Sequence, residues 1–137
     1  MEENRMMPVV FVNCKDTPFV DLIICGRKQF ETRTKNTLGK LVGKRVLIAE
    51  TGCGKPVVRC SAVISYAIPV NSQHSWEMHR RRCGISSGSK YNWKPDTKVK
   101  WLYRLCGVVA CYPFTPPEGI RHGRAWMEYE NTWRIFE

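Results

Sequence analysis

The sequence predicts one α+β domain, mainly β, in which about six mostly antiparallel strands close into a small barrel with two short helices at the barrel ends. The chain has 137 residues, the size of a single domain with its own core, and we expect that domain to span residues 1–137. Short apolar or alternating runs recur along it, but without the strict strand–helix alternation of a parallel sheet. Closure into a barrel would remove the exposed edges of such a sheet.

The chain is expected to begin with a strand followed by a short helix. Residues 9–12 (Val-Val-Phe-Val) form a β-branched run typical of a strand. Asp16 or Thr17 can cap a helix over residues 18–25. Pro18 supports this start, because proline is favoured in the first helical turn. Gly26 is expected to end this helix, because glycine adopts the left-handed conformation that closes a helix.

Residues 26–33 (Gly-Arg-Lys-Gln-Phe-Glu-Thr-Arg) are the most informative stretch of the chain. As a strand, this stretch places Glu31 and Arg33 on one face, with Lys28 at the bend just before them. Three charges of mixed sign this close cost desolvation energy unless they pair with one another or meet a ligand. Both a structural ion pair and a functional site are consistent with the pattern.

The middle of the chain predicts a hairpin formed by residues 44–50 and 56–66, which flank a glycine-rich turn. This turn is not a phosphate-binding loop, because its glycine spacing is wrong and Pro56 follows the lysine. Beyond it, Asn71 or Ser72 can cap a helix over residues 73–83.

The last third of the chain is expected to be strand-rich. A loop over residues 86–96 leads to a strand over residues 99–112 with a break at Gly107. Residues 113–119 are irregular because proline removes ladder donors, and residues 125–135 form the last strand.

The composition points to a polyanionic partner. The chain has 22 Lys and Arg against 12 Asp and Glu, a net charge of +10. Such an excess favours RNA or another single-stranded nucleic acid, or a nucleoside ligand, through counterion release. A membrane is not expected, since there is no long basic amphipathic helix and no apolar run of about 20 residues. The seven cysteines are an odd number in no paired pattern, which predicts free thiols and a cytoplasmic protein. We also expect a monomer.

The motif Gly26-x-Lys28-x-x-Glu31-x-Arg33, after a helix and before the Gly-Lys-Arg-Val-Leu-Ile run of residues 43–48, resembles the ASCH domain, a branch of the PUA-like β-barrels. The resemblance extends more weakly to residues 101–105 and 113–119. It implies a PUA-like barrel whose cleft, near the helices, is lined by the motif and binds RNA or nucleotides.

Some ASCH-like domains look like hydrolases, among them ribonucleases and amidohydrolases that deacetylate N4-acetylcytidine. In the amidohydrolases the motif supplies a lysine, matched by Lys28, and a threonine nucleophile where this chain has Glu31. Their third group is a carboxylate, for which Glu77 is the nearest counterpart. Glu31 cannot replace threonine as an acyl nucleophile without a different mechanism. In a hydrolase, the catalytic residues would be Lys28, Glu31 and Arg33, with Glu31 as general base and the two cations stabilising the developing anion.

Nucleic-acid binding in a basic cleft is the preferred hypothesis. Tyr91 and Trp93 interleave with Lys90 and Lys94, so the rings could stack on bases while the lysines hold phosphates. Alternatively, Trp93 plugs one end of the barrel. The expected nucleic-acid-binding residues are Lys28, Arg33, Lys40, Lys44, Arg45, Arg80, Arg81, Arg82, Lys90, Tyr91, Trp93, Lys94, His122 and Arg124.

No metal site and no cofactor are expected. His79 and Cys83 share a helix face, but the chain has no Cys-x-x-Cys pair to complete a tetrahedral site. An interaction domain without a nucleic-acid role is a third hypothesis, and the salt dependence of binding would distinguish it.

Overall fold

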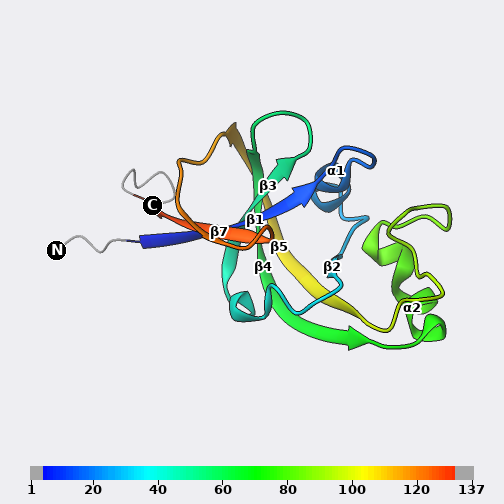
Figure 1. Ribbon diagram of the computed structural model, residues 1–137. Coiled ribbons are helices and arrows are strands. Elements are labelled where there is room, and N and C mark those ends of the chain that lie inside the picture. The colour runs from blue at the N-terminus through cyan, green and yellow to red at the C-terminus, as the bar shows by residue number, and fades with distance from the viewer. Residues whose placement is uncertain (1–4, 132–137) are drawn as a thin grey trace.

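The structure is a computed structural model that describes residues 5–131, and it consists of one mixed sheet of seven strands with short helices (Figure 1). The strands are β1 (Arg5–Asn13), β2 (Phe30–Arg33), β3 (Arg45–Thr51), β4 (Val57–Val70), β5 (Lys100–Phe114), β6 (Ile120–His122) and β7 (Trp126–Asn131). The helices are α1 (Phe19–Ile24) and α2 (Gln73–His79), with 3-10 turns η1 (Gly39–Leu41) and η2 (Arg80–Cys83). The α+β, mainly β, prediction is confirmed. Residues 132–135 of the predicted last strand lie outside the described residues.

The sheet is not closed, so the prediction of a closed barrel was wrong. Its strand order is β2-β5-β4-β3-β1-β7-β6, which leaves β2 and β6 as edges. Only the β1–β3 pairing is parallel among the pairings described. The register between β1 and β7 ends at Val10, opposite Trp126, and the Phe11 amide then donates to the carbonyl of Ala125 at 3.0 Å. Beyond that point β1 keeps a strand partner on one side only among residues 5–131.

The open side of β1 faces the edge strand β2. The Nη2 atom of Arg33 in β2 donates to the carbonyl oxygen of Phe11 in β1 at 2.7 Å. A side chain therefore spans a gap that backbone pairing does not close. We call this gap, between β2 and residues 11–13 of β1, the seam.

The predicted β3–β4 hairpin is confirmed, and the strand predicted to break at Gly107 continues through that residue. Gly107 has a φ of +56°, and the register between β4 and β5 shifts between the Ser61 and Val63 pairs next to it. A bulge therefore bends the strand without ending it.

The two helices form close to the predicted positions, but only α2 has its predicted side-chain cap. The N-cap of α1 is Pro18, without a side-chain hydrogen bond, so neither Asp16 nor Thr17 caps it. Asp16 instead pairs with Lys90, its Oδ2 lying 2.5 Å from Nζ. Helix α2 begins at Gln73 and Ser72 caps it as predicted, its hydroxyl accepting the Ser75 amide hydrogen at 3.1 Å.

Apolar side chains are buried on both sides of β1. Val10 and Val12 belong to the main core with Trp76, while Val9 and Phe11 belong to a smaller cluster on the opposite face. Burial of each such side chain contributes about 1.5–3 kcal/mol. Helix α1 packs against β1, β3, β4 and β5, and η2 packs against β2, which places both beside the seam. No helix within residues 5–131 is long and apolar enough to cross a membrane.

Candidate nucleic-acid interface

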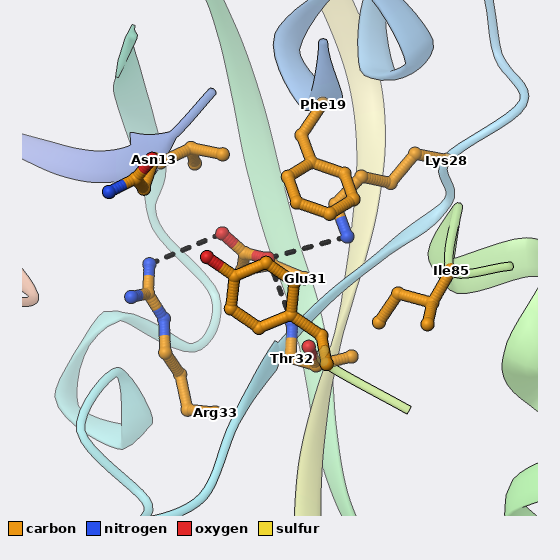
Figure 2. A pocket seen from close by; sticks show the side chains of 9 residues that line it. Asn13, Phe19, Lys28, Glu31, Thr32, Arg33 and Ile85 are labelled. Atoms are coloured by element: carbon orange, nitrogen blue, oxygen red, sulfur yellow. Dashed lines mark hydrogen bonds and ion pairs between the residues drawn. The ribbon is translucent and has the colours of Figure 1, made fainter. Parts of the chain in front are cut away.

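A pocket of about 130 Å³ opens at the seam (Figure 2). Its walls come from β1, α1, β2 and the segment after η2. The lining residues are Val12, Asn13, Phe19, Lys28, Glu31, Thr32, Arg33, Ile85 and Tyr91. The chain thus brings together the charged motif and one of the two aromatic residues predicted from the Lys90–Lys94 segment.

Glu31 lies between two cations, as Figure 2 shows. Its Oε1 is 3.4 Å from Lys28 Nζ, and its Oε2 accepts a hydrogen bond from Arg33 Nη2 at 3.2 Å. The backbone amide of Thr32 also donates to Oε1 at 2.9 Å. The predicted placement of Glu31 and Arg33 on one face of β2, with Lys28 at the bend before it, is confirmed.

Lys28 is buried, with 2% of its surface exposed, because the fold surrounds its ammonium group with acceptors. Nζ donates to the carbonyl of Cys83 at 2.6 Å and lies 4.7 Å from the centre of the Phe19 ring. That carbonyl ends η2, where Gly84 has a φ of +72°. A Cβ on Gly84 would lie 3.3 Å from Cβ of Lys28, so glycine also permits the close approach of the lysine stem.

Arg33 holds the two sides of the seam together. Its Nη2 donates both to Phe11 in β1 and to Glu31 in its own strand. Its Nε atom is buried and has no hydrogen-bond partner within residues 5–131. An unsatisfied buried donor costs about 1–3 kcal/mol. The two hydrogen bonds of Nη2 offset this cost and hold the guanidinium in position.

The Glu31 carboxylate is held in its ionised form. Burial raises its pKa, but Lys28, Arg33 and the Thr32 amide together outweigh that effect, and the pKa lies below its ordinary value. With a cation at each oxygen, the Glu31 carboxylate serves as a hydrogen-bond acceptor. Its pKa is not raised toward neutral pH, as the pKa of a general base would be.

A larger groove of about 390 Å³ shares Tyr91 with the seam pocket. It runs along the loop before β5 and the start of that strand, and we call it the lysine groove. Its lining residues are Thr34, Lys90, Tyr91, Asn92, Lys94, Asp96, Thr97, Lys98, Val99 and Lys100. Four of these ten are lysines, so cations dominate its walls.

The structure gives Tyr91 and Trp93 partly structural roles. The ring of Tyr91 makes an edge contact with Phe19, with ring centres 5.7 Å apart, and both Tyr91 and Trp93 pack against the main core. Tyr91 also lines both pockets, whereas Trp93 lines neither.

The arginines after α2 lie outside both pockets. Arg80 bonds Glu77 and the carbonyl of Ile85, so it ties the end of α2 to the next segment. This pairing leaves Glu77 half-exposed and away from the seam pocket. Arg82 donates to Gln29 and lies over the Phe30 ring, and Arg81 is exposed.

The remaining predicted binding residues are not gathered at these pockets either. Lys40 and Lys44 are exposed, and Arg45 bonds Ser61 and the carbonyl of Gly107 on the β4–β5 side of the sheet. His122 stacks on Trp126 with ring centres 3.9 Å apart and bonds Glu128, and Arg124 is exposed in the adjoining turn.

The sequence interpretation did not identify several lining residues. Asn13 ends a β-branched strand, which is a detectable signal, because polar residues at strand ends often line sites. Ile85 and Phe19 read as ordinary core positions. Lys100 was included only in the predicted strand over residues 99–112 and Lys98 in no predicted element, although alternation around them could have marked their shared face.

The described residues contain no evident metal site. Within residues 5–131 no three His, Cys, Asp or Glu side chains are grouped to hold an ion. His79 bonds the carbonyl of Ser75, and all seven cysteines are free thiols.

The comparisons with known proteins identify the fold. No protein-family model and no curated protein sequence matches the chain. Among solved structures, an ASCH protein from Zymomonas mobilis matches with a TM-score of 0.65 at 18% identity, over 80% of this chain and 73% of that one. A serine-to-alanine mutant of the Zymomonas mobilis ASCH protein gives 0.71 at 17%, over 90% and 88%. A tyrosine-to-phenylalanine mutant gives 0.72 at 16%, over 92% and 91%.

Proposed function

We propose that this chain, whose fold is that of an ASCH domain, binds single-stranded RNA or a modified nucleoside and holds one base in the seam pocket. The observation that carries this proposal is the combination of an aromatic wall and directed polar groups in one small opening beside a groove lined by lysines.

The dimensions of the seam pocket suit a single planar ring. Its volume of about 130 Å³ equals the space of roughly four water molecules at about 30 Å³ each, which is comparable to one pyrimidine base. The rings of Phe19 and Tyr91 offer apolar surface for it, and base–aromatic stacking contributes about 1–3 kcal/mol.

The polar groups of the pocket can read the edge of such a ring. Asn13 is exposed, and its Oδ1 accepts the Lys15 amide hydrogen at 2.9 Å, which orients the amide group. Its Nδ2 has no hydrogen-bond partner within residues 5–131 and can donate to a ligand. The ionised Glu31 carboxylate adds an acceptor, so the site pairs a donor with an acceptor as a base edge requires.

The electrostatics favour binding over hydrolysis. A general base works best with a pKa near the working pH, but the pKa of Glu31 is lowered and both of its oxygens already accept hydrogen bonds from neighbouring groups. The hydrolase alternative predicts cleavage products after incubation with RNA or N4-acetylcytidine, and we expect none from this carboxylate.

The test is fluorescence anisotropy with a labelled single-stranded RNA, measured for the unmodified chain, Asn13→Ala and Asn71→Ala. Asn71 is exposed, lies before α2 and lines neither pocket, so it is the matched control. Loss of one hydrogen bond should weaken binding by about two- to tenfold in Asn13→Ala. Asn71→Ala should bind like the unmodified chain.

Salt provides the second arm of the same experiment. The logarithm of the binding constant should fall linearly with the logarithm of the salt concentration, by roughly 0.7 for each phosphate contacted on a single strand. Binding that is insensitive to salt, or equal for the two asparagine variants, would contradict the proposal.

A further inference from the structure

Lys100 is a buried cation that pairs with no carboxylate of residues 5–131. Only 7% of its surface is exposed, and its Nζ donates to the carbonyl of Tyr91 at 2.7 Å. The same atom lies 4.9 Å from the centre of the Trp76 ring. Within the part of the chain that the structure describes, Lys100 forms no ion pair. Buried charges are usually compensated by an opposite charge, so this lysine is set up to receive an anion.

A second cation lies close enough to act on Lys100. Burial is the main cause that lowers the pKa of Lys100, and repulsion from Lys94 lowers it further. Two like charges facing one pocket repel each other, and an anion between them would remove that repulsion.

The backbone holds the exposed lysines of the groove in place. The Lys94 amide donates to the Thr97 hydroxyl at 2.9 Å, and the Thr97 amide donates to the Lys94 carbonyl at 2.9 Å. This reciprocal turn fixes Lys94 and positions Lys98 just beyond it. Neither lysine forms an ion pair within residues 5–131, although the exposed carboxylate of Asp96 also lines the groove.

Lys90 completes the groove but is already neutralised. Its Nζ lies 2.5 Å from Asp16 Oδ2 and 5.2 Å from the centre of the Tyr91 ring. This pair fastens the loop to the segment before α1, and so anchors Tyr91 where the two pockets meet. The available cations of the groove are therefore Lys94, Lys98 and Lys100.

We propose that the lysine groove is a phosphate-binding subsite, in which Lys94, Lys98 and Lys100 hold a phosphate group next to Tyr91. Because Tyr91 also borders the seam pocket, the phosphate is that of a nucleotide whose base occupies the seam. This second statement rests on the proposed function, whereas the anion site rests on the groove alone. The preferred ligand is then a nucleotide or an RNA strand and not a free nucleoside.

The experiment is a set of amide NMR titrations of the full chain with three probes: inorganic pyrophosphate, uridine, and the dinucleotide UpU. Pyrophosphate should shift amides of residues 90–100 and leave residues 13 and 31–33 unchanged. Uridine should shift residues 13 and 31–33 together with Tyr91, which borders both pockets, and should leave residues 94–100 unchanged. UpU should shift both sets and bind more tightly than uridine.

Charge variants show whether the groove itself binds the anion. Lys98→Gln removes one exposed cation and should weaken pyrophosphate binding by up to about fivefold. Lys55→Gln removes another exposed cation, at the β3–β4 turn outside the groove, and should leave pyrophosphate binding unchanged. Lys100→Met keeps the packed stem without the charge and should reduce binding more than Lys98→Gln does. If Lys100→Met fails to fold, the comparison of Lys98→Gln with Lys55→Gln still decides whether the groove binds pyrophosphate.

The outcomes separate the two proposals. Pyrophosphate that leaves residues 90–100 unshifted, or that binds Lys98→Gln and Lys55→Gln equally, overturns the phosphate subsite. Shifts at residues 90–100 with pyrophosphate, but none at the seam with uridine or UpU, support the anion site and contradict the proposed function.

Discussion

Replacing Glu31 with glutamine tests how the seam holds its charges. Glutamine keeps the size of the side chain and one acceptor but removes the negative charge between Lys28 and Arg33. Removing one partner of a buried pair costs about 3–5 kcal/mol, because the other charge stays buried and uncompensated. Lys28 keeps its bond to Cys83 and its contact with Phe19, and the Arg33 side chain is 23% exposed, which favours the lower end, about 3 kcal/mol.

The assay is urea unfolding of Glu31→Gln and the unmodified chain as a function of pH. With a urea dependence of about 1–3 kcal/mol per molar, the midpoint at pH 7 should fall by about 1–3 M. The folded pKa of Glu31 is lowered, so its stabilising contribution is complete above the unfolded value of about 4.5 and is lost as pH falls through the folded pKa. The difference between the two proteins should therefore shrink in acid.

Glu118→Gln is the matched control, because Glu118 is exposed and forms no ion pair within residues 5–131. This substitution should change the free energy of unfolding by less than about 0.5 kcal/mol. A loss below about 1 kcal/mol in Glu31→Gln, or a loss that stays constant from pH 7 into acid, would refute the idea that Glu31 compensates two buried cations.

Further predictions concern the seam, the aromatic wall, β6 and the thiols. Arg33→Lys should lose the guanidinium Nη2 group that donates to both Phe11 and Glu31, cost about 1–3 kcal/mol, and speed amide exchange in residues 11–13. Tyr91→Ala should weaken RNA binding by roughly 5- to 150-fold in the anisotropy assay, and an unchanged affinity would show that the ring only packs. Gly119→Ala would place a Cβ against the carbonyl oxygen of Glu128 in β7, so it should displace β6 and cost about 1–3 kcal/mol in urea unfolding. Burial raises the pKa of Cys83 to about 12, so at pH 8 an alkylating reagent should modify the exposed Cys25 and spare Cys83, and equal rates would contradict this burial.

The charged motif could be predicted because its geometry is local. Alternation in a short strand fixes Glu31 and Arg33 on one face, and the glycine that ends the helix places Lys28 at the bend. The helices, the β3–β4 hairpin and the mainly β class likewise follow from short-range signals.

The rest of the site depends on contacts between residues far apart in the sequence. Lys28 finds its acceptor on Cys83, and Arg33 finds its acceptor on Phe11 across the seam. Whether the sheet closes depends on where the pairing between β1 and β7 stops, which no local pattern encodes. Asp16 could have capped α1 but pairs with Lys90, because an ion pair with a distant loop competes with local capping.

A crystal structure of the protein with a short single-stranded RNA tests the central claim most directly. We expect one base in the seam pocket, against Tyr91 and within hydrogen-bonding distance of Asn13 and Glu31, with its phosphate in the lysine groove. An RNA bound elsewhere, such as across Arg45 or the turn at Arg124, with the seam pocket left without a base, would contradict it.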